Sequence, residues 1–293
     1  MNQPTAKVKH ITASSNISLI ELLTQHLTNN NCEKIIDAGG VWMQQQRLTN
    51  PKHQIQAKQT VKVYISPTQG YRYGFSSESI IQETDDWVVV YKEPLVTIGM
   101  DRSNQYFNLM AGLNDYYGYH DLSRGVQPIT RLDYRVAGLA LFSKTKKAES
   151  YLFKQMQQKR IKKRYQILVP GNGYRSWYRV KNRLNSHFKA YEDDNGKVAI
   201  TAFVKQSELT NYTKFEVATQ TGRRHQIRCH AAKMIAPLVN DELYGHRSTD
   251  RHQPIGLIAT RLIFQFNRKV VDIQLSNDWV YNWQKWFEGR DLV

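Results

Sequence analysis

A single acidic residue, Asp133, lies just before a glycine and an apolar run that has the length of a buried strand, within Ile129-Thr-Arg-Leu-Asp-Tyr-Arg-Val-Ala-Gly138-Leu. Leu132 separates Asp133 from Arg131. If the leucine enters the core, the two-residue period of an extended chain places Arg131 and Asp133 together on the opposite face. The pair is then either a surface ion pair or part of a site built on a core strand. Two further segments, described below, favour the site.

Strand-length patterns dominate the chain from about residue 76 to its end. Asp193-Asp-Asn-Gly196 separates two such patterns and predicts a hairpin, and residues 270–275 are expected to pair with 257–266. An amphipathic pattern predicts a helix over 148–160. Asp278 is expected to cap a last helix whose aromatic stripe packs in the core. We therefore predict an α+β domain over 76–293 with a mixed, mainly antiparallel sheet. Its other expected strands are 86–91, 164–169, 187–191, 198–204 and 213–219.

A smaller unit is predicted over 14–66. Apolar residues recur at helical spacing over 17–27, a short helix over 32–38 ends at Gly39-Gly40, and extended segments follow from Val41 and over 55–65. Residues 1–13 are polar, and we expect them to be frayed. Pro and Gly residues between 66 and 74 are typical of a linker.

The charge of the chain indicates a polyanionic partner. Its 293 residues carry a formal net charge of +16, with a pI of about 9.7. Two cysteines are too few for a disulfide framework, which favours a reducing compartment. The first residues do not resemble a signal peptide, and no apolar run approaches the roughly 18 residues of a membrane helix. We expect a soluble, cytoplasmic protein that does not contact a membrane and acts as a monomer.

Three blocks carry a family resemblance. The first is the Arg-Leu-Asp segment, the second is Lys162-Lys-Arg-Tyr165-Gln-Ile-Leu-Val-Pro-Gly171, and the third is Thr221-Gly-Arg-Arg-His225-Gln-Ile-Arg228, followed by residues 237–245. Their content and order resemble the RluA family of RNA pseudouridine synthases. The chain departs from the family pattern where Thr130 replaces a usual His, Val136-Ala137 replaces Thr-Ser, and Arg224 replaces a common Thr. These departures are typical of a divergent branch, in which activity can be reduced.

The resemblance implies a reaction and roles for three residues. Asp133 matches the catalytic aspartate, which either attacks carbon 1 of the ribose or removes a ribose proton on a glycal route. Arg228 matches the arginine that pairs with it and keeps it ionised. Tyr165 matches the tyrosine that stacks on the flipped base, and its hydroxyl is a candidate acceptor for the proton that leaves carbon 5. The isomerisation needs no cofactor and no metal.

Basic residues near these three are expected to bind the RNA substrate, an rRNA or a tRNA. On the helix expected after Gly222, Arg224, Arg228 and His225 share one side. Lysines at a helix end also suit the helix dipole, but beside a site they favour phosphate contact. The RNA-binding candidates are Arg131, His225, Arg223, Arg224, Lys163 and Arg164.

Other interpretations remain open to different degrees. The 14–66 unit resembles the alpha-L RNA-binding domain, but acidic residues on its second helix also suit a simple packing role. A non-catalytic RNA-binding or RNA-chaperone protein would explain the charge, though not the joint presence of Asp133, Tyr165 and Arg228. A methyltransferase is disfavoured because the chain lacks a Gly-x-Gly-x-x-Gly loop. A metal site at His225, Cys229 and His230 is disfavoured by their spacing.

Overall fold

The computed structural model describes residues 6–27, 31–119, 125–245 and 253–287. The chain forms two compact units. The first unit comprises Met1–Ser76 and Val96–Val126, and the second comprises Ser77–Leu95 and Gln127–Val293. The sequence analysis placed residues 96–126 with the larger domain, whereas their contacts group them with the N-terminal residues.

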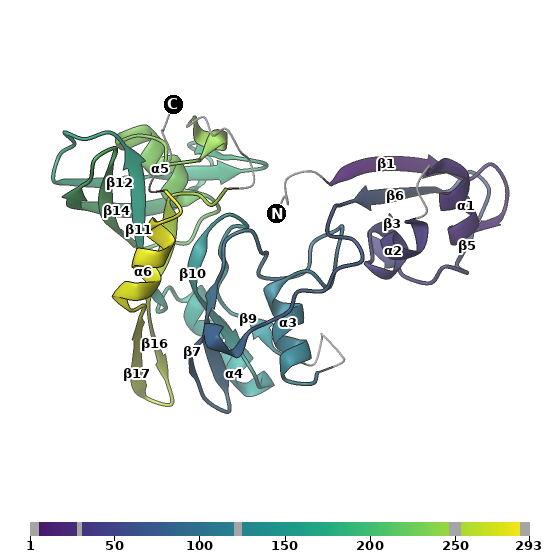
Figure 1. Cartoon of the computed structure of the whole chain (residues 1–293), viewed down its shortest axis with the longest axis horizontal. Coiled ribbons are helices and arrows are strands. Elements are labelled where there is room, and N and C mark those ends of the chain that lie inside the picture. The colour runs from purple at the N-terminus through teal and green to yellow at the C-terminus, as the bar shows by residue number, and fades with distance from the viewer. Residues whose placement is uncertain (1–5, 28–30, 120–124, 246–252, 288–293) are drawn as a thin grey trace. The chain divides into compact units, whose positions relative to one another are not determined.

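The first unit packs two helices against a four-stranded sheet of order β1-β6-β3-β4 (Figure 1). Helix α1 begins where Ser18 and Glu21 form a capping box, which satisfies two backbone N–H groups that the first turn leaves unpaired. Helix α2 ends before Gly39, whose φ of 72° suits a residue without Cβ. The elements of this unit are β1 (Lys7–Thr12), β2 (Ile17–Ser18), α1 (Leu19–His26), α2 (Cys32–Asp37), β3 (Val41–Met43), β4 (Gln46–Leu48), β5 (Gln54–Ile55), β6 (Thr60–Ile65) and α3 (Leu109–Tyr116).

The expectation that residues 1–13 are frayed is wrong for those described, since β1 pairs along its length with β6. Ile11 explains the difference because it is buried among Leu22, Leu23 and Val61. Only one residue of β1 enters the core, so the polar remainder concealed the strand in the sequence.

Residues 96–126 join the first unit through hydrogen bonds to backbone carbonyls. The Trp42 indole donates to the Arg102 carbonyl at 2.8 Å, and the Gln105 amide donates to Ala38 at 2.9 Å. Asn104 donates through Nδ2 to the Thr68 carbonyl at 2.6 Å. These bonds join positions far apart in the sequence, so local patterns did not reveal them.

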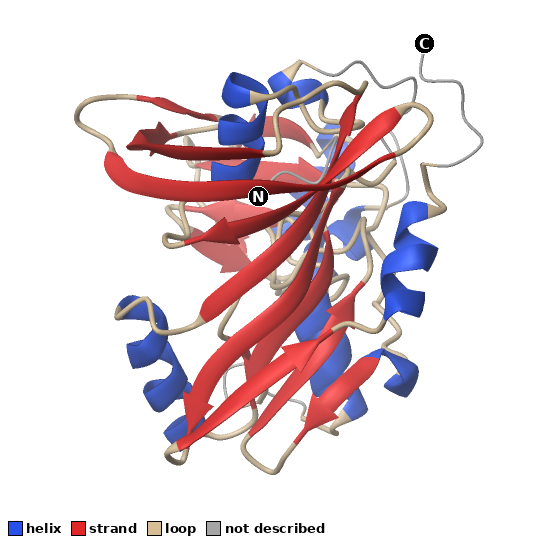
Figure 2. Ribbon diagram, turned by 90° about the vertical axis from the view of Figure 1, so that its left-hand side faces the viewer, coloured by secondary structure: helices blue, strands red, loops and turns tan. Residues whose placement is uncertain are grey.

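The second unit contains one large sheet of order β13-β12-β14-β15-β11-β16-β10-β8-β7, with β17 beside β16 and β9 beside β10. Among the described strands, β10 and β16 form the parallel pair, and the other pairs are antiparallel. The prediction of an α+β fold with a mixed, mainly antiparallel sheet is confirmed. Figure 2 shows the long strands twisting through this sheet. The elements are η1 (Ser77–Ser79), β7 (Ile80–Glu83), β8 (Trp87–Lys92), β9 (Gln127–Pro128), β10 (Ala137–Ser143), α4 (Lys146–Gln157), β11 (Lys162–Pro170), β12 (Trp177–Ser186), β13 (Ala190–Glu192), β14 (Lys197–Glu208), β15 (Tyr212–Thr219), α5 (Gln226–Met234), η2 (Glu242–Tyr244), β16 (Leu257–Phe266), β17 (Lys269–Gln274) and α6 (Asn277–Gln284).

The hairpin predicted around residues 193–196 is wrong in its partners. The turn itself forms, with Gly196 donating to the Asp193 carbonyl at 2.8 Å. However, β13 and β14 both pair with β12 and not with each other. Gly196 is required there because a Cβ would lie 2.5 Å from the Leu184 carbonyl carbon. The predicted pairing of β16 with β17 is confirmed.

Helices α4 and α6 contribute side chains to the core of the second unit. From α6, Trp283 is buried, and Phe287, just past the helix end, is buried beside it. Trp286 is 45% exposed, so only part of the predicted aromatic stripe packs in the core. Ser276 rather than Asp278 occupies the N-cap, and Asp278 lies in the first turn. Among the described residues, no helix combines the length and apolar character needed to cross a membrane.

Candidate active site

A cavity in the second unit is surrounded by four segments of the chain. They are the loop before β10, strand β11, the end of β15 with the turn that follows it, and the first turn of α5. Leu257 of β16 adds one apolar side chain. The lining residues are Arg131, Leu132, Asp133, Val136, Tyr165, Thr219, Thr221, Gly222, Arg223, His225, Gln226, Ile227, Arg228 and Leu257.

Asp133 lies in a loop and not on a strand. Residues 131–133 are irregular and β10 begins at Ala137, so the expected alternation of Arg131 and Asp133 along a strand is wrong. Leu132 is nevertheless buried, as the alternation required. Backbone bonds fix the loop: Val136 donates to the Asp133 carbonyl at 3.1 Å, and Leu95 donates to the Tyr134 carbonyl at 2.7 Å.

Gln226 sets the start of α5. Its side-chain oxygen accepts from the Thr221 hydroxyl at 2.8 Å and from the Arg223 backbone amide at 3.0 Å, while its side-chain nitrogen, Nε2, donates to the Ile200 carbonyl at 3.0 Å. This buried amide joins the turn after β15 to strand β14. His225, immediately before it, adopts a left-handed conformation with φ of 51°, which ends the turn and begins the helix.

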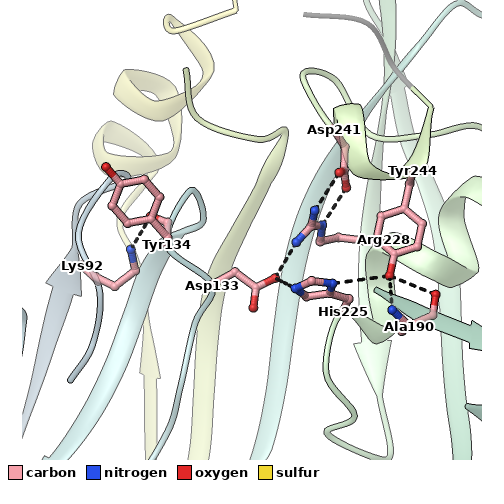
Figure 3. Close-up of polar contacts among 8 residues, drawn as sticks. All are labelled: Lys92, Asp133, Tyr134, Ala190, His225, Arg228, Asp241 and Tyr244. Atoms are coloured by element: carbon pink, nitrogen blue, oxygen red, sulfur yellow. Dashed lines mark hydrogen bonds and ion pairs between the residues drawn. The ribbon is translucent and has the colours of Figure 1, made fainter. Parts of the chain in front are cut away.

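Arg228 lies between two carboxylates, as Figure 3 shows. Its Nη1 donates to Asp133 Oδ2 at 3.0 Å, and its Nε and Nη2 donate to the two oxygens of Asp241 at 2.7 and 2.8 Å. Burial alone would lower the pKa of Arg228, but the hydrogen bonds and charge of Asp241, with a contribution from Asp133, raise it. Arg228 is therefore a permanent cation beside Asp133.

His225 contacts Asp133 from the same side as Arg228. Its Nε2 lies 3.6 Å from Asp133 Oδ2, and its Nδ1 lies 3.4 Å from the Tyr244 hydroxyl. Burial lowers the pKa of His225 to about 4, with the charge of Asp133 opposing the shift and Arg228 adding to it. The imidazole is therefore neutral at pH 7, and it adds a polar contact to Asp133 without a second full charge.

Tyr165 supplies an aromatic wall. It lies on β11 opposite Val217 of β15 and Ala259 of β16, and its side chain is 8% exposed. Burial raises the pKa of Tyr165, with the charge of Asp133 adding to the shift, so the phenol keeps its proton at neutral pH. A flat, neutral ring on the cavity wall suits stacking on a base.

Lys92 stands behind the Asp133 loop and was missed by the sequence analysis. It is fully buried at the end of β8, and its Nζ donates to the carbonyls of Glu93 at 2.7 Å and Tyr134 at 3.3 Å. Burial lowers its pKa to about 7, against the opposing charges of Asp133 and Glu93. No local pattern marks this lysine, because its partner Tyr134 lies on a distant loop.

The structure brings six of the nine predicted site residues to the cavity, namely Asp133, Tyr165, Arg228, Arg131, His225 and Arg223. Arg223 is partly structural, since its Nε donates to the Val198 carbonyl at 3.1 Å.

Three predicted residues, Arg224, Lys163 and Arg164, are absent from the cavity lining. Arg224 is exposed. Lys163 is half-buried and burial lowers its pKa to about 8, whereas Arg164 is exposed and pairs with Arg261 in the sheet register.

The three residues considered for a metal site have separate partners. His225 contacts Asp133 and Tyr244, whereas His230 bonds to Thr201 and Asn182, each at 2.8 Å. Cys229 is a free thiol. Within the described part of the chain, no three His, Cys, Asp or Glu residues gather as a metal ion would require.

Comparison with known proteins identifies one family. The sequence profile described as RNA pseudouridylate synthase matches residues 86–233, about half of the chain and all three blocks. Ribosomal large subunit pseudouridine synthase D of Haemophilus ducreyi is 28% identical over 172 residues, which cover 58% of this chain and 53% of that protein. The chain thus spans little more than half the length of this relative.

Two further proteins extend the match. The dual-specificity RNA pseudouridine synthase RluA of Pasteurella multocida is 28% identical over 210 residues, which cover 69% of this chain and 90% of that protein. The solved structure of human RNA pseudouridylate synthase domain containing 1 has a TM-score of 0.59 at 20% identity, covering 71% of this chain and 86% of its own. At that identity the likeness concerns the fold.

Proposed function

Because the chain belongs to the RNA pseudouridylate synthase family, we propose that it converts specific uridines of a structured rRNA or tRNA to pseudouridine. The observation that carries the proposal is the ion pair between Asp133 and Arg228, at 3.0 Å, in a cavity walled by Tyr165. The names of two relatives, ribosomal large subunit pseudouridine synthase D of Haemophilus ducreyi and tRNA pseudouridine synthase C of Pasteurella multocida, support rRNA or tRNA as the substrate class.

The reaction exchanges one bond of the base for another. The bond between carbon 1 of the ribose and N1 of uracil breaks, and a bond from that carbon to C5 forms. The proton of C5 leaves and N1 gains one, so no atom is imported and no electron is transferred. A cofactor is therefore unnecessary, and we propose that the enzyme works without one, as a monomer in the cytoplasm. Cys32 and Cys229 do not form a disulfide, which is compatible with that reducing compartment.

Asp133 starts the reaction, either as a nucleophile at carbon 1 of the ribose or as a base on a ribose proton. Both routes need an ionised carboxylate in a site that excludes water, where desolvation favours the neutral acid. Arg228 offsets this effect because its charge is fixed and its Nη1 bonds to Asp133 Oδ2. Tyr165 stacks on the flipped uracil. Because its phenol stays protonated, its hydroxyl can take the C5 proton only while it passes its own proton on to another base.

RNA affinity comes from basic residues around the cavity. Arg131 and Arg223 line it, and Arg224, Lys163 and Arg164 lie outside the lining, where they can contact phosphates of the flanking nucleotides. His225 contacts the opened nucleotide position. The alpha-L-like residues 14–66 of the first unit add a further RNA contact, to which the exposed Lys52 and Lys58 contribute.

The test is tritium release from RNA labelled at C5 of uracil, using total RNA from cells that lack the protein. Wild type should release tritium, and Asp133→Asn should release none while its RNA affinity changes by less than about threefold, because the substitution keeps the shape of the side chain. Asp272→Asn is the matched control, since Asp272 forms an exposed pair with Arg261 on β16 and β17. This control should retain wild-type release.

Two results would count against the proposal. Release by Asp133→Asn would remove the aspartate from the reaction. RNA binding without release by the wild type, on RNA and on assembling ribosomal particles alike, would favour a non-catalytic RNA-binding or chaperone protein that keeps the fold.

A further inference from the structure

Strand β12 lies next to the edge of the large sheet (Figure 1) and carries a basic face. Its sequence contains three cationic residues at alternate positions and no acidic residue. Because side chains alternate between the two faces of a sheet, these cations share a face with the indole that begins the strand. All four residues are exposed, and we call them the β12 strip: Trp177, Arg179, Lys181 and Arg183.

The β12 strip lies on the face of the sheet opposite the cavity. Tyr165, which lines the cavity, pairs with Val217, and Val217 pairs with Phe203. Phe203 pairs with Tyr178 of β12, and the side chains of cross-strand partners share a face. Since the residues of the strip alternate with Tyr178 along the strand, they point to the reverse face.

The other residues of β12 confirm this orientation. Val180 and Leu184 are buried, and Asn182 Oδ1 lies 2.8 Å from Nε2 of His230 on α5. Helix α5 therefore packs against the face that carries Tyr178, and the strip faces away from it.

Apolar and basic residues of the neighbouring strands continue the reverse face. The four partners of the strip on β14 are apolar: Val198, Ile200, Ala202 and Val204. Val204, opposite Trp177, is 50% exposed, and Trp177 is 67% exposed. Farther across the sheet, the exposed Arg164 lies in the same row of partners as Arg179. An RNA-binding candidate that is absent from the cavity lining thus has a place on this face.

The charge of this face complements a polyanion. The strip contributes three positive charges, whereas two acids on the same face, Glu216 and Asp272, lie on β15 and β17, where Asp272 is bonded to Arg261. Successive cations of the strip are two residues, or about 6.7 Å, apart along the strand. An extended RNA strand can place successive phosphates at such a spacing, and an exposed indole can stack on a base.

Cations on an edge strand can also be protective. Strand β13 pairs with β12 at residues 184–186, so within the described residues the outer backbone edge of 177–183 has no partner strand. Cationic side chains at such an edge discourage pairing with another chain. Protection does not account for Trp177 and Val204, because an exposed apolar pair at this edge would favour association.

We propose that the β12 strip binds a segment of the RNA substrate away from the target uridine, with phosphates on its three cations and a base stacked on Trp177. The inference rests on the proposed function, which makes the partner an RNA. Strands β12 and β11 are three strand spacings apart, about 14 Å, so an RNA that occupies the cavity and the strip together extends over the edge of the sheet.

The first experiment locates the RNA. The photoreactive residue benzoylphenylalanine replaces Val204, beside the strip, or Val270 of β17 as the control; the two valines are 50% and 71% exposed. Irradiation with total RNA from cells that lack the protein should crosslink RNA to position 204 and not to position 270. Equal crosslinking at the two positions, or none at position 204, would overturn the proposal.

The second experiment measures the affinity for the same RNA by filter binding as salt is varied. The β12 triple variant carries Arg179→Gln, Lys181→Gln and Arg183→Gln. The α4 triple variant removes the same net charge from exposed positions through Lys146→Gln, Lys147→Gln and Lys154→Gln. The β12 variant should bind at least tenfold more weakly, and its slope of log affinity against log salt should fall by about 2, for three lost phosphate contacts. The α4 variant should lose less than about threefold, and equal losses in both would mean that net charge alone matters, which would overturn the proposal.

Trp177 is tested separately in the same assay. Trp177→Ala should weaken RNA binding at least fivefold, whereas Trp177→Phe, which keeps a ring, should change it by less than about twofold. Because Trp177 is 67% exposed, neither variant should shift the urea midpoint. Full affinity in Trp177→Ala would refute the stacking contact.

Two outcomes separate this proposal from its alternatives. If the β12 triple variant aggregates while its monomeric fraction keeps wild-type affinity, the cations protect the edge and the proposal fails. If the wild type releases no tritium although the β12 triple variant still loses RNA affinity, the proposed function fails and the RNA contact stands.

Discussion

Lys92 gives the folded protein a dependence on pH that can be measured. The side chain is fully buried, and its Nζ donates to the carbonyls of Glu93 and Tyr134, the second of which adjoins Asp133. Burial lowers the pKa of Lys92 to about 7. A lysine in the unfolded chain has a pKa of about 10.4. The two states therefore bind different numbers of protons over about three pH units.

The sign of the effect follows from linkage. Below pH 7 both states carry the proton, and the folded protein bears the full cost of a buried ammonium. Between about pH 7 and 10.4 the unfolded chain holds a proton that the folded protein lacks, so the free energy of unfolding rises with pH. The slope approaches about 1.4 kcal/mol per pH unit, and the whole interval amounts to about 4 to 5 kcal/mol.

Urea denaturation of wild type and Lys92→Met between pH 6.5 and 9.5 isolates this contribution. The other titrating groups are the same in both proteins, so they cancel in the difference between the two free energies of unfolding. The stability of the wild type relative to the variant should rise by about 1.4 kcal/mol per unit above pH 7.5. Lys147→Met, at an exposed position of α4, is the control and should show no such slope. A flat difference for Lys92→Met would refute the buried, neutralised lysine and its role in holding the Asp133 loop.

Substitutions at two further positions, Gly138 and Tyr165, test the fold and the cavity. A Cβ at Gly138 would lie 2.2 Å from the Ala259 carbonyl oxygen at a φ of 117°. Gly138→Ala should therefore lower the free energy of unfolding by about 3 kcal/mol or more in urea denaturation, and an effect below about 1 kcal/mol, as expected for Gly99→Ala, would contradict this packing. Tyr165→Phe should keep the KM for RNA within about threefold, whereas Tyr165→Ala should raise it at least tenfold through lost stacking. Equal KM values for the two variants would argue against stacking by the ring.

Much of the site could be predicted because its residues lie in blocks that are continuous in sequence. Asp133, Tyr165 and Arg228 each stand in one block, and the sheet register then brings the blocks to one cavity. Asp241 lay within a segment quoted with the third block, but nothing in its neighbourhood indicated that it would bond to Arg228. A buried ion pair depends on where two loops meet, and that depends on the whole packed core.

In the fold, too, pairings between segments adjacent in sequence could be predicted, whereas pairings between distant segments could not. The hairpin of β16 and β17 was predicted because its turn and both strands are adjacent in sequence. The turn at 193–196 was also recognised, but its strands each pair with β12, a choice that depends on distant register. Residues 96–126 and the rest of the first unit are joined by hydrogen bonds from side chains to backbone carbonyls, and a backbone carbonyl leaves no trace in the sequence.

Three departures from the family pattern, at Thr130, Val136 and Ala137, lie in the core of the second unit, whereas Arg224 is exposed. Val136 and Ala137 are buried, so hydroxyls at those positions would need partners inside the core. Thr130 keeps a structural role, because its hydroxyl accepts from the Leu141 amide at 2.9 Å. The Asp133 loop is held instead by main-chain bonds, by Lys92 and by the 253–256 segment. These supports do not depend on the altered side chains, so the substitutions before Gly138 leave the carboxylate in place, and they argue for retained rather than lost catalysis.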